Sequence, residues 1–578
     1  MTKILKKTEM ILEGRGIITL NPSDHMATGG EGSVYRKNDT VIKIYTDSQK
    51  MICDGMMDKI TQLSRCRHKF IVTPENVVRD MAQQPIGYYM PYVAGEPLSR
   101  VFTNDYRNRT NFNDQDANIL VDHMRTVTEY AHKNKAIMVD ANELNWLVVD
   151  KKIHAPEPRV IDVDAWAIGK WGARVIMPSI RDWHAHTFDT LSDWFSWGVV
   201  TFQIYTGIHP YKGKLDGYKQ QELERRMKDN ASVFRKDVRL NHAVRDFSSI
   251  PSVLCKWYED VFTKGKRSVP PSPFDAGKIV PAKGRVMHAQ NIGGKNLLIF
   301  EKLFESNYSV VQIFNEGIIL LKNGDMIDLS RKKKICTVST AHIAVTRQND
   351  GWLVAEYNRG KISCRYFDYL TSAEENISID IIASGVISSG SRMFVVNERG
   401  LTEIVLFEAN NKHLISMGNT WSVSPHATKW FEGLGVEDIM GAMHLIIPFG
   451  VRACATIRTK ELDGMSVVMG RCGARFATVI ALDQKGLYHK FEFYFDTGYQ
   501  SYVLWQDVVD NAELIIAILP KGVCATIVAD GALDIFVPST GAHQKVSDAL
   551  IKTGTQLAQW NNTVIYVEDK KVWRVRMK

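Results

Sequence analysis

The sequence has no C-x-x-C pair among its eight cysteines, which lie far apart at positions 53, 66, 255, 336, 364, 454, 472 and 524. This spacing disfavours a zinc ribbon, a thioredoxin-type motif and a dense disulfide scaffold, so we expect reduced thiols in a cytosol. No uninterrupted apolar run approaches the ~20 residues that a membrane helix needs. The basic N-terminus, MTKILKKTEMILEGRG, lacks the apolar run of a secretory signal. We therefore expect a soluble, cytoplasmic protein without a membrane partner.

A strong charge imbalance is also missing, because 72 lysines and arginines face 64 acids and the formal net charge is +8. Such a mild excess does not require a nucleic-acid partner, and the basic run at 331–334 is expected to be a solvated turn. An apolar fraction of 45% and a charged fraction of 24% are typical of globular proteins. Since single cores stop growing near about 250–300 residues, a chain of 578 residues predicts several domains.

Two textures divide the chain. Up to about residue 269, β-like runs alternate with helix-like runs, the former at 34–45 and 87–93, the latter at 47–64, 114–133 and 193–205. Strands with one early helix, followed by a mostly helical region, are typical of an α+β fold with segregated layers. The segment KGKRSVPPSPFDAGK, rich in Pro, Gly and Ser, indicates the end of that domain and a connector. The sequence thus predicts domains at 1–275 and 286–578, joined by a linker at 276–285.

The second texture repeats an apolar strand, a tight turn with Asn, Asp or Gly, and another apolar strand. The clearest examples are 317–329, 352–367, 393–407, 478–493, 526–537 and 563–575. Their period-two pattern and turn residues predict hairpins. The turns recur about every 40 residues, with one double interval that predicts a further, irregular unit near 440–465. Such repetition favours an all-β domain of the six- or seven-bladed β-propeller type, with a pair of β-sandwiches or a β-helix as the alternative.

A glycine-rich segment near the N-terminus carries the first candidate site. It holds Gly29, Gly30 and Gly32, followed by Val34 and, in the next β-like run, Lys43. Glycines allow bare backbone N–H groups to approach phosphate oxygens. An apolar strand should not hold an inward-pointing lysine unless that lysine meets an anion. A glycine-rich hairpin turn without a ligand is the alternative interpretation.

Two acidic segments about 20 residues apart carry the second candidate site. Asp140 and Asn145 form D-x-x-x-x-N, and Asp162 follows a β-like run. Magnesium takes hard oxygen ligands, usually one or two carboxylates, which leaves room for substrate phosphates. Asn145 and Asp162 could hold such an ion while Asp140 accepts a hydroxyl proton. For either segment alone, an acidic turn that caps a strand is the alternative.

In this order the motifs resemble the protein kinase superfamily over residues 20–275. The resemblance implies a multidomain chain whose first domain is a bilobal kinase-like fold, with an N-lobe at about 15–93 and a C-lobe at about 94–275. It implies binding of ATP and Mg²⁺ and phosphoryl transfer to protein Ser/Thr hydroxyls. The IDVDAW segment and the downstream repeats are similar to kinase-like proteins of bacteria and their phages, so we expect a bacterial cell or a phage-infected host. The second domain would recruit a protein substrate or partner.

The resemblance also assigns roles to single residues. It implies nucleotide contacts from Gly29, Gly30, Gly32, Val34, Lys43, Met90 as gatekeeper and Val93, catalytic roles for Asp140, Lys43 and Asn145, and metal binding by Asn145 and Asp162. Asp193 and Arg267 would be scaffold residues, and 177–179 would end the activation segment.

Three positions depart from the family pattern. Val139 stands where an arginine precedes the catalytic aspartate, so control by activation-loop phosphorylation is not expected. Asn142 replaces a lysine that would stabilise charge on the transferring phosphate. Asp164 replaces a glycine and adds a carboxylate near the metal. A nucleotide-binding pseudokinase that acts as a scaffold is therefore the alternative function, and a small-molecule kinase is a third.

The acidic partner of Lys43 is the fourth departure. No glutamate lies between residues 44 and 74, where the family places it on a helix. Asp58, or else Asp54, is expected to take its place. Elsewhere, the segment RDWHAHTFD could suggest a metal cluster, but H-x-H on a loop is more often solvent-facing or capping, and we do not expect His184 and His186 to bind metal.

Overall fold

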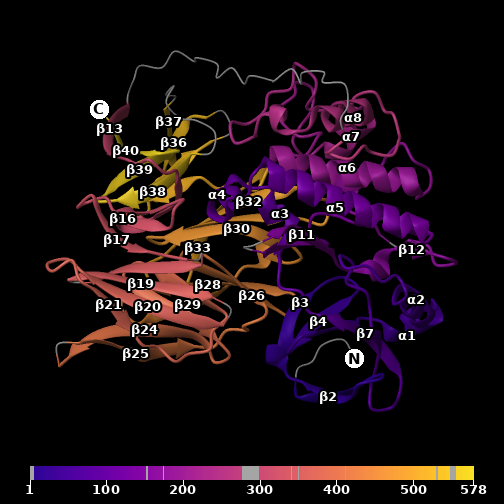
Figure 1. Cartoon of the computed structure of the whole chain (residues 1–578), viewed down its shortest axis with the longest axis horizontal. Helices are drawn as coiled ribbons and strands as arrows, with labels where there is room; N and C mark the ends of the chain where they lie inside the picture. The colour runs from indigo at the N-terminus through magenta and orange to yellow at the C-terminus, as the bar shows by residue number, and fades with distance from the viewer. Residues whose placement is uncertain are drawn as a thin grey trace.

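The computed structural model describes residues 6–151, 154–173, 175–275, 298–339, 342–348, 350–358, 360–410, 412–528, 531–546 and 555–577. The linker predicted at 276–285, and residues 286–297 after it, lie outside this description. Figure 1 shows an N-terminal part that is rich in sheet and helix beside an all-β C-terminal part, as predicted at this level of detail. Within the described ranges, no helix has the length and apolar character needed to cross a bilayer.

A seven-stranded antiparallel sheet opens the N-terminal part. Its order is β2 (Gly16–Leu20), β1 (Thr8–Leu12), β6 (Asn76–Arg79), β7 (Pro85–Pro91), β5 (Thr40–Tyr45), β4 (Gly32–Lys37) and β3 (His25–Thr28). One face of the sheet buries its own cluster of apolar side chains. The register places Lys43 of β5 opposite Val34 of β4 on one side and Tyr88 of β7 on the other. Lys43 therefore lies on an interior strand.

Two short helices, rather than the single helix predicted at 47–64, follow β5. Helix α1 (Ser48–Cys53) begins after Asp47, whose side chain accepts a hydrogen bond from the backbone N–H of Lys50. Helix α2 (Met56–Leu63) begins after Gly55. Gly55 has φ of +70°, which L side chains rarely adopt, so this residue ends one helix and starts another. Apolar residues of both helices pack against β5 and β7.

In the described residues, six further α-helices follow in the N-terminal part. They are α3 (Leu98–Val101), α4 (Asn104–Thr110), α5 (Asp114–Lys133), α6 (Thr190–Thr206), α7 (Leu223–Lys228) and α8 (Ser252–Phe262). The helix predicted at 114–133 is confirmed as α5, which a capping box formed by Asn113 and Asp116 closes at its start. The helix predicted at 193–205 lies within α6, which ends at Gly207 with φ of +75°.

Short strands bring two polar loops together. β10 (Trp146–Lys151) and β11 (His154–Val160) form a hairpin, to which β8 (Glu96–Pro97) adds a third strand. β9 (Ala136–Ile137) pairs with β12 (Ala167–Ile168). The loop at 140–145 joins β9 to β10, and the loop at 161–166 joins β11 to β12. Because these strands pair, the two loops lie side by side.

In the described residues, the C-terminal part consists of seven four-stranded antiparallel sheets. They are β14 (Val310–Phe314), β15 (Ile318–Leu321), β16 (Asp325–Asp328) and β17 (Lys333–Thr337); β18 (Ile343–Gln348), β19 (Gly351–Asn358), β20 (Lys361–Asp368) and β21 (Glu374–Ile377); β22 (Gly385–Ser389), β23 (Arg392–Asn397), β24 (Gly400–Ala409) and β25 (Lys412–Trp421); β26 (Thr428–Phe431), β27 (Leu434–Ile439), β28 (Ala442–Phe449) and β29 (Ala453–Arg458); β30 (Ser466–Gly473), β31 (Phe476–Leu482), β32 (Tyr488–Phe495) and β33 (Tyr502–Val509); β34 (Ile516–Ile518), β35 (Cys524–Ile527), β36 (Leu533–Val537) and β37 (Ala542–Val546); and β13 (Leu298–Glu305), β40 (Lys571–Met577), β39 (Thr563–Glu568) and β38 (Gln556–Trp560).

The last of these sheets contains both the first and the last strand of the C-terminal part. β13 pairs with β40, whereas each of the other six sheets uses four consecutive strands. All six predicted hairpins are present. A regular sheet, β26–β29, occupies the place where an irregular unit was predicted near 440–465. The run at 331–334 lies at and before the start of β17, in a mostly exposed stretch.

The two parts share a hydrophobic core. One buried cluster contains Trp194 of α6 together with Val468 of β30 and Tyr488 of β32. At the seven-stranded sheet, the Thr28 backbone N–H donates to Asp438 Oδ2 at 3.1 Å. In Figure 1, the strand β26 runs toward β3, and β30 lies close to α3. The C-terminal part therefore packs against both the seven-stranded sheet and the helical region.

Candidate active site

Lys43 is buried and paired with two aspartates from the 161–166 loop. Its side-chain Nζ donates to Asp162 Oδ1 at 2.6 Å and to both oxygens of Asp164 at 3.0 and 3.1 Å. The residue is 6% exposed, and Asp164 is 1% exposed. The expectation that an inward-pointing lysine on this strand must meet an anion is confirmed.

Asp164 is held by three groups in addition to Lys43. The Tyr88 hydroxyl donates to Asp164 Oδ1 at 2.8 Å and the Tyr45 hydroxyl donates to Oδ2 at 3.2 Å. From helix α2, the ammonium of buried Lys59 donates to the backbone oxygen of Asp164 at 2.6 Å. Lys43 completes the set. The carboxylate is thus fixed by two strands, and the Asp164 backbone is tied to helix α2.

The charges of this cluster follow from its burial and its ion pairs. Burial disfavours the charged form of Asp164, but Lys43 and the hydrogen bonds from Lys43 and Tyr88 outweigh burial and lower its pKa to about 2. Burial raises the pKa of Asp162 to about 6, with Lys43 opposing and Asp164 adding to the effect. Burial also favours neutral Lys43, yet Asp162 and Asp164 raise its pKa well above the usual value. Asp162 keeps 38% of its side chain exposed, so it is the aspartate of the pair that an incoming ligand can reach.

The predicted partner of Lys43 was wrong. Asp58 and Asp54 are exposed, and neither makes the contact. Asp58 instead lines a cavity of about 450 Å³ with Arg65 and Trp171. The physical reason is the direction of α2, which turns Lys59 rather than Asp58 toward the 161–166 loop. Asp164 supplies the carboxylate from that loop.

Asp140, the predicted base, begins the 140–145 loop and is held from two sides. Its Oδ1 accepts the backbone N–H of Met177 at 2.8 Å, and its backbone oxygen accepts Asn145 Nδ2 at 2.7 Å. Burial raises the pKa of Asp140, with the Met177 hydrogen bond opposing and Glu31 adding to burial. The Asn145 carbonyl accepts the N–H of Ile161, so Asn145 lies beside the loop that carries Asp162.

Asp193 holds the backbone at the start of this loop, which agrees with its predicted scaffold role. Its carboxylate accepts the backbone N–H groups of Met138 at 2.7 Å and Val139 at 2.9 Å, and it bonds His132 Nε2 at 2.9 Å. Val139 has φ of +58°, a left-handed conformation that is costly for a β-branched residue. The hydrogen bond that the Val139 N–H donates to Asp193 helps to keep Val139 in this conformation, directly ahead of Asp140.

The glycine-rich hairpin faces the same cluster through Glu31. The hairpin joins β3 to β4, with the Gly29 N–H bonded to the Gly32 carbonyl at 2.9 Å. A side chain at Gly32 would place its Cβ 2.4 Å from the Ile44 carbonyl oxygen, whereas a Cβ at Gly30 would meet nothing within 4 Å. Glu31 Oε2 lies 3.9 Å from Lys43 Nζ. Gly32 is thus required by strand packing, while the protein itself leaves open space at Gly30.

The predicted nucleotide-contacting residues Met90 and Val93 lie near the end of β7. Met90 is partly buried and packs with the apolar cluster of Tyr45 and Tyr88. Val93 follows the strand and lines a cavity of about 720 Å³ together with Pro91. Val34 is half-buried on β4 and lies opposite Lys43 in the register.

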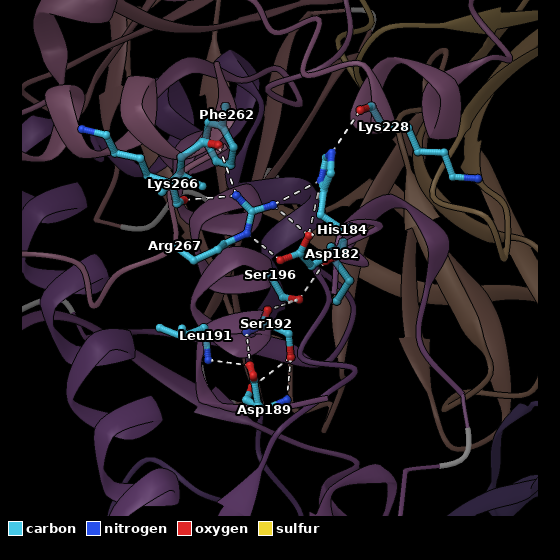
Figure 2. A network of polar contacts seen from close by, with 12 residues as sticks. Asp182, His184, Asp189, Leu191, Ser192, Ser196, Lys228, Phe262, Lys266 and Arg267 are labelled. Atoms are coloured by element: carbon cyan, nitrogen blue, oxygen red, sulfur yellow. Dashed lines mark hydrogen bonds and ion pairs between the residues drawn. The ribbon is translucent and has the colours of Figure 1, made fainter. Parts of the chain in front are cut away.

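Asp182 and Arg267 form the scaffold ion pair that Figure 2 shows. Arg267 donates to Asp182 through Nε at 2.5 Å and through a terminal nitrogen at 2.7 Å. The acid partner of this arginine therefore follows the predicted end of the activation segment at 177–179. His184 lies against Arg267 at 3.4 Å and bonds the Lys228 carbonyl at 3.0 Å. His184 and exposed His186 do not converge on a metal centre.

The donor set fits a magnesium ion that arrives with phosphates. Across the described ranges, no three His, Cys, Asp or Glu side chains are arranged to hold a metal by themselves. Magnesium commonly takes one or two protein oxygens and completes its shell with water and phosphate oxygens. Asp162 is partly exposed. Asn145 donates its Nδ2 to the Asp140 carbonyl, so its side-chain Oδ1 is the atom that would face a metal ion.

Comparisons with known proteins give no assignment. No protein-family model matches this chain, and no curated protein matches it significantly. The site geometry therefore carries the functional argument.

Sequence reasoning missed several residues of the site. Asp164 was noticed only as an extra carboxylate, and Tyr45, Tyr88, Lys59 and Met177 were not assigned roles. Tyr45 and Tyr88 could have been found from the strand pattern. Tyr45 lies on the same strand as Lys43, and Tyr88 lies on the neighbouring strand. The contacts of Lys59 and Met177 depend on how distant segments pack, and no local pattern marks them.

Proposed function

We propose that the chain transfers the γ-phosphoryl group of ATP, with Mg²⁺, to protein Ser/Thr hydroxyls. This proposal depends mainly on the position of Lys43. Its buried ammonium is paired with Asp162 and Asp164 and lies close to the glycine-rich hairpin. A seven-stranded sheet next to a helical region supports a bilobal kinase-like fold. The resemblance noted in the sequence points in the same direction.

Each residue of the site has a role in this proposal. Lys43 orients the ATP phosphates, and the open space at Gly30 lets backbone N–H groups approach them. Asp162 and Asn145 hold Mg²⁺, which neutralises charge on the phosphates. Asp140 orients the acceptor hydroxyl and accepts its proton, since its pKa is raised by burial. Positioning and charge neutralisation supply most of the acceleration.

The adenine site of this proposal lies at the end of β7. Met90 is its gatekeeper, and the backbone at Val93 bonds the base.

The C-terminal part supports a propeller that binds a protein substrate or partner. The seven separate four-stranded sheets of the described residues favour seven blades over six, and over a pair of β-sandwiches or a β-helix. In a propeller, pairing of β13 with β40 would close the ring. The eight free cysteines support a reducing cytoplasm, in a bacterial cell or a phage-infected host.

A nucleotide-binding scaffold without transferase activity is the second candidate. Two observations favour it: Glu31 places a further carboxylate 3.9 Å from Lys43, and buried Asn142 takes the place of a cation in the 140–145 loop. Both features weaken the positive potential that a transferring phosphate requires.

The two candidates differ in what Asp140 does. Purified chain is incubated with labelled ATP, Mg²⁺ and casein, beside the variants Asp140→Asn and Asp162→Asn. The exposed Asp507→Asn, on β33, is the matched control. We expect label on casein with the wild type and the control, a roughly 10²- to 10⁴-fold loss with Asp140→Asn, and a similar loss with Asp162→Asn.

Binding is measured separately as the rise in melting temperature with ATP and Mg²⁺. We expect Asp140→Asn to retain this rise and Asp162→Asn to lose most of it. No transfer by the wild type, together with a retained rise, would support the scaffold. Neither transfer nor a rise would contradict both candidates.

A further inference from the structure

A rigid turn of the C-terminal part reaches the N-terminal part near its polar loops. This 483–488 turn joins β31 to β32 and comprises Asp483 to Tyr488. The Asp483 carboxylate accepts the backbone N–H groups of Lys485 at 2.8 Å and Leu487 at 2.9 Å, and it bonds His489 at 2.9 Å. The Asp483 N–H and carbonyl are bonded within the turn as well. The turn is therefore fixed by its own hydrogen bonds.

Gly486, at the tip of this turn, lies against the segment that ends at Ser179. A Cβ built on Gly486 would lie 1.9 Å from Ser179 Oγ, 2.3 Å from Ser179 Cβ and 3.3 Å from Met177 Sδ. Gly486 also has φ of +79°, which few L side chains adopt. Both the space and the backbone conformation require glycine here. The turn and the 177–179 segment consequently fit together without a gap.

Lys212 makes a second contact between the same turn and the helical region. This lysine is 5% exposed, donates from Nζ to the Gly486 carbonyl at 3.2 Å, and lies 4.7 Å from the centre of the Tyr488 ring. Its backbone N–H bonds the carbonyl of His209, and His209 in turn bonds the Ser179 carbonyl at 2.8 Å. The Gly486 tip is thus held by Ser179 on one side and by Lys212 on the other.

Both contacts lead to the 140–145 loop. Met177 donates its backbone N–H to Asp140 Oδ1 at 2.8 Å, so the segment pressed by Gly486 also sets the direction of the Asp140 carboxylate. Glu143, in the same loop, is 2% exposed, and its Oε2 has no hydrogen bond among the described residues. The charge of Lys212 stabilises this buried carboxylate and opposes the burial that raises its pKa. One contact of the turn therefore reaches Asp140 through Met177, and the charge of Lys212, which holds the other side of the turn, acts on Glu143 in the same loop.

We propose that the 483–488 turn is a positioning element for Asp140, acting through the Met177 backbone and through Lys212. Gly486 and Lys212 are its positioning residues. The C-terminal part then does more than bind a partner, because the orientation of the proposed base depends on it. The expected effect on kcat rests on the proposed transfer function. The expected effect on the Met177–Asp140 hydrogen bond does not.

The test uses the full chain with Gly486→Ala. The matched control is Gly541→Ala, a glycine with φ of +69° and nothing within 4 Å of its Cβ, which carries the backbone strain without the clash. Ser179→Gly is combined with Gly486→Ala to remove both atoms of the clash. Ser179→Ala removes only Oγ and leaves Cβ at 2.3 Å, so it should restore less. Lys212→Met tests the second contact and serves if Gly486→Ala does not fold.

Two readouts separate positioning from folding. Hydrogen exchange of the Met177 amide should accelerate at least roughly tenfold in Gly486→Ala, remain at the wild-type rate in Gly541→Ala, and return toward it when Ser179→Gly is added. Phosphoryl transfer should show a kcat lower by roughly 10- to 100-fold with KM for ATP within about twofold, because Lys43 and Asp162 are untouched. Lys212→Met should lower kcat in the same way.

The outcomes are distinguishable. If the wild type transfers no phosphate, the transfer function fails and hydrogen exchange alone tests the positioning contact. Faster Met177 exchange in Gly486→Ala that Ser179→Gly restores would then still support the contact. Unchanged Met177 exchange in Gly486→Ala would overturn the inference. So would a loss that Ser179→Gly does not restore, or a loss of equal size in Gly541→Ala.

Discussion

Lys43 Nζ lies 3.0 Å from Asp164 Oδ2, and this pair is the most enclosed charge contact of the candidate site. The carboxylate comes from the position two residues after Asp162, not from helix α2. The helix is instead coupled to the site by Lys59, which bonds the backbone oxygen of Asp164 at 2.6 Å. An acid on the helix was expected to pair with Lys43. The helix instead supplies a cation, Lys59, and the loop supplies the acceptor.

Asp164→Asn should destabilise the N-terminal part and weaken nucleotide binding. Removing one partner of a buried ion pair leaves Lys43 undercompensated, at a cost of about 3 kcal/mol. We expect a lower melting temperature and a Kd for ATP with Mg²⁺ at least roughly tenfold higher. The matched control is exposed Asp58→Asn, which should stay within about 0.5 kcal/mol of the wild type. Equal effects of the two variants would show that Asp164 does not hold Lys43.

Nucleotide binding with Mg²⁺ should weaken as the pH falls from 7 to 5. Burial raises the pKa of Asp162 to about 6, and a cation binds only its ionised form. The ionised fraction falls roughly tenfold over this interval. Asp162 also contributes to folding stability, because the folded state holds its proton more tightly than the unfolded chain does. This contribution is largest below the ordinary pKa of an aspartate and is lost as the pH rises through about 6.

Calorimetric titration between pH 5 and 8 measures this dependence. Asp140→Asn should retain it, because the proposed role of Asp140 is in transfer rather than in binding. Asp162→Asn should bind weakly at every pH. Wild-type affinity that stays constant down to pH 5 would contradict the assignment of Asp162.

The glycines of the β3–β4 hairpin should separate folding from ligand binding. Gly32→Ala places a Cβ 2.4 Å from the Ile44 carbonyl oxygen and should force β4 away from β5, with a lower melting temperature. Gly30→Ala meets nothing within 4 Å and should leave stability within about 0.5 kcal/mol of the wild type. If phosphates approach this loop, Gly30→Ala should still raise the Kd for ATP. Gly385→Ala, a similarly open glycine on β22, is the control that should change neither quantity.

His209 should contribute to acid sensitivity. Burial, with Lys212 adding to it, lowers the pKa of His209 to about 3, so the folded state keeps the ring neutral. The unfolded chain takes up this proton near pH 6.5, and stability is therefore lost as the pH falls, by about 2 kcal/mol between pH 6.5 and 5. His209→Gln should lower stability at neutral pH but flatten the dependence. Melting temperatures at pH 7.5 and 5, with exposed His186→Gln as control, measure the difference, and an unchanged slope in His209→Gln would contradict this role.

Local patterns in the sequence predicted the elements that carry the site. The helical periodicity at 114–133 matched α5, and alternating hairpins with Gly or Asn at their turns matched the strands of the C-terminal part. The prediction at 47–64 was less accurate, because a single left-handed Gly55 divides that stretch into two helices. The unit near 440–465 was expected to be irregular, yet its strands follow the same four-stranded pattern as their neighbours.

The sequence by itself determined that an anion must meet Lys43, because a cation on an interior strand is stable only when it is paired. It also determined where Asp140, Asn145 and Asp162 stand along the chain. Only the tertiary structure decided that Asp164 rather than Asp58 supplies the anion, and that Gly486, more than 300 positions away from Asp140, presses on the segment bonded to it. Periodicity reports which face of an element is buried, but the choice among several nearby carboxylates depends on how helices, loops and sheets pack, which no short stretch of residues encodes.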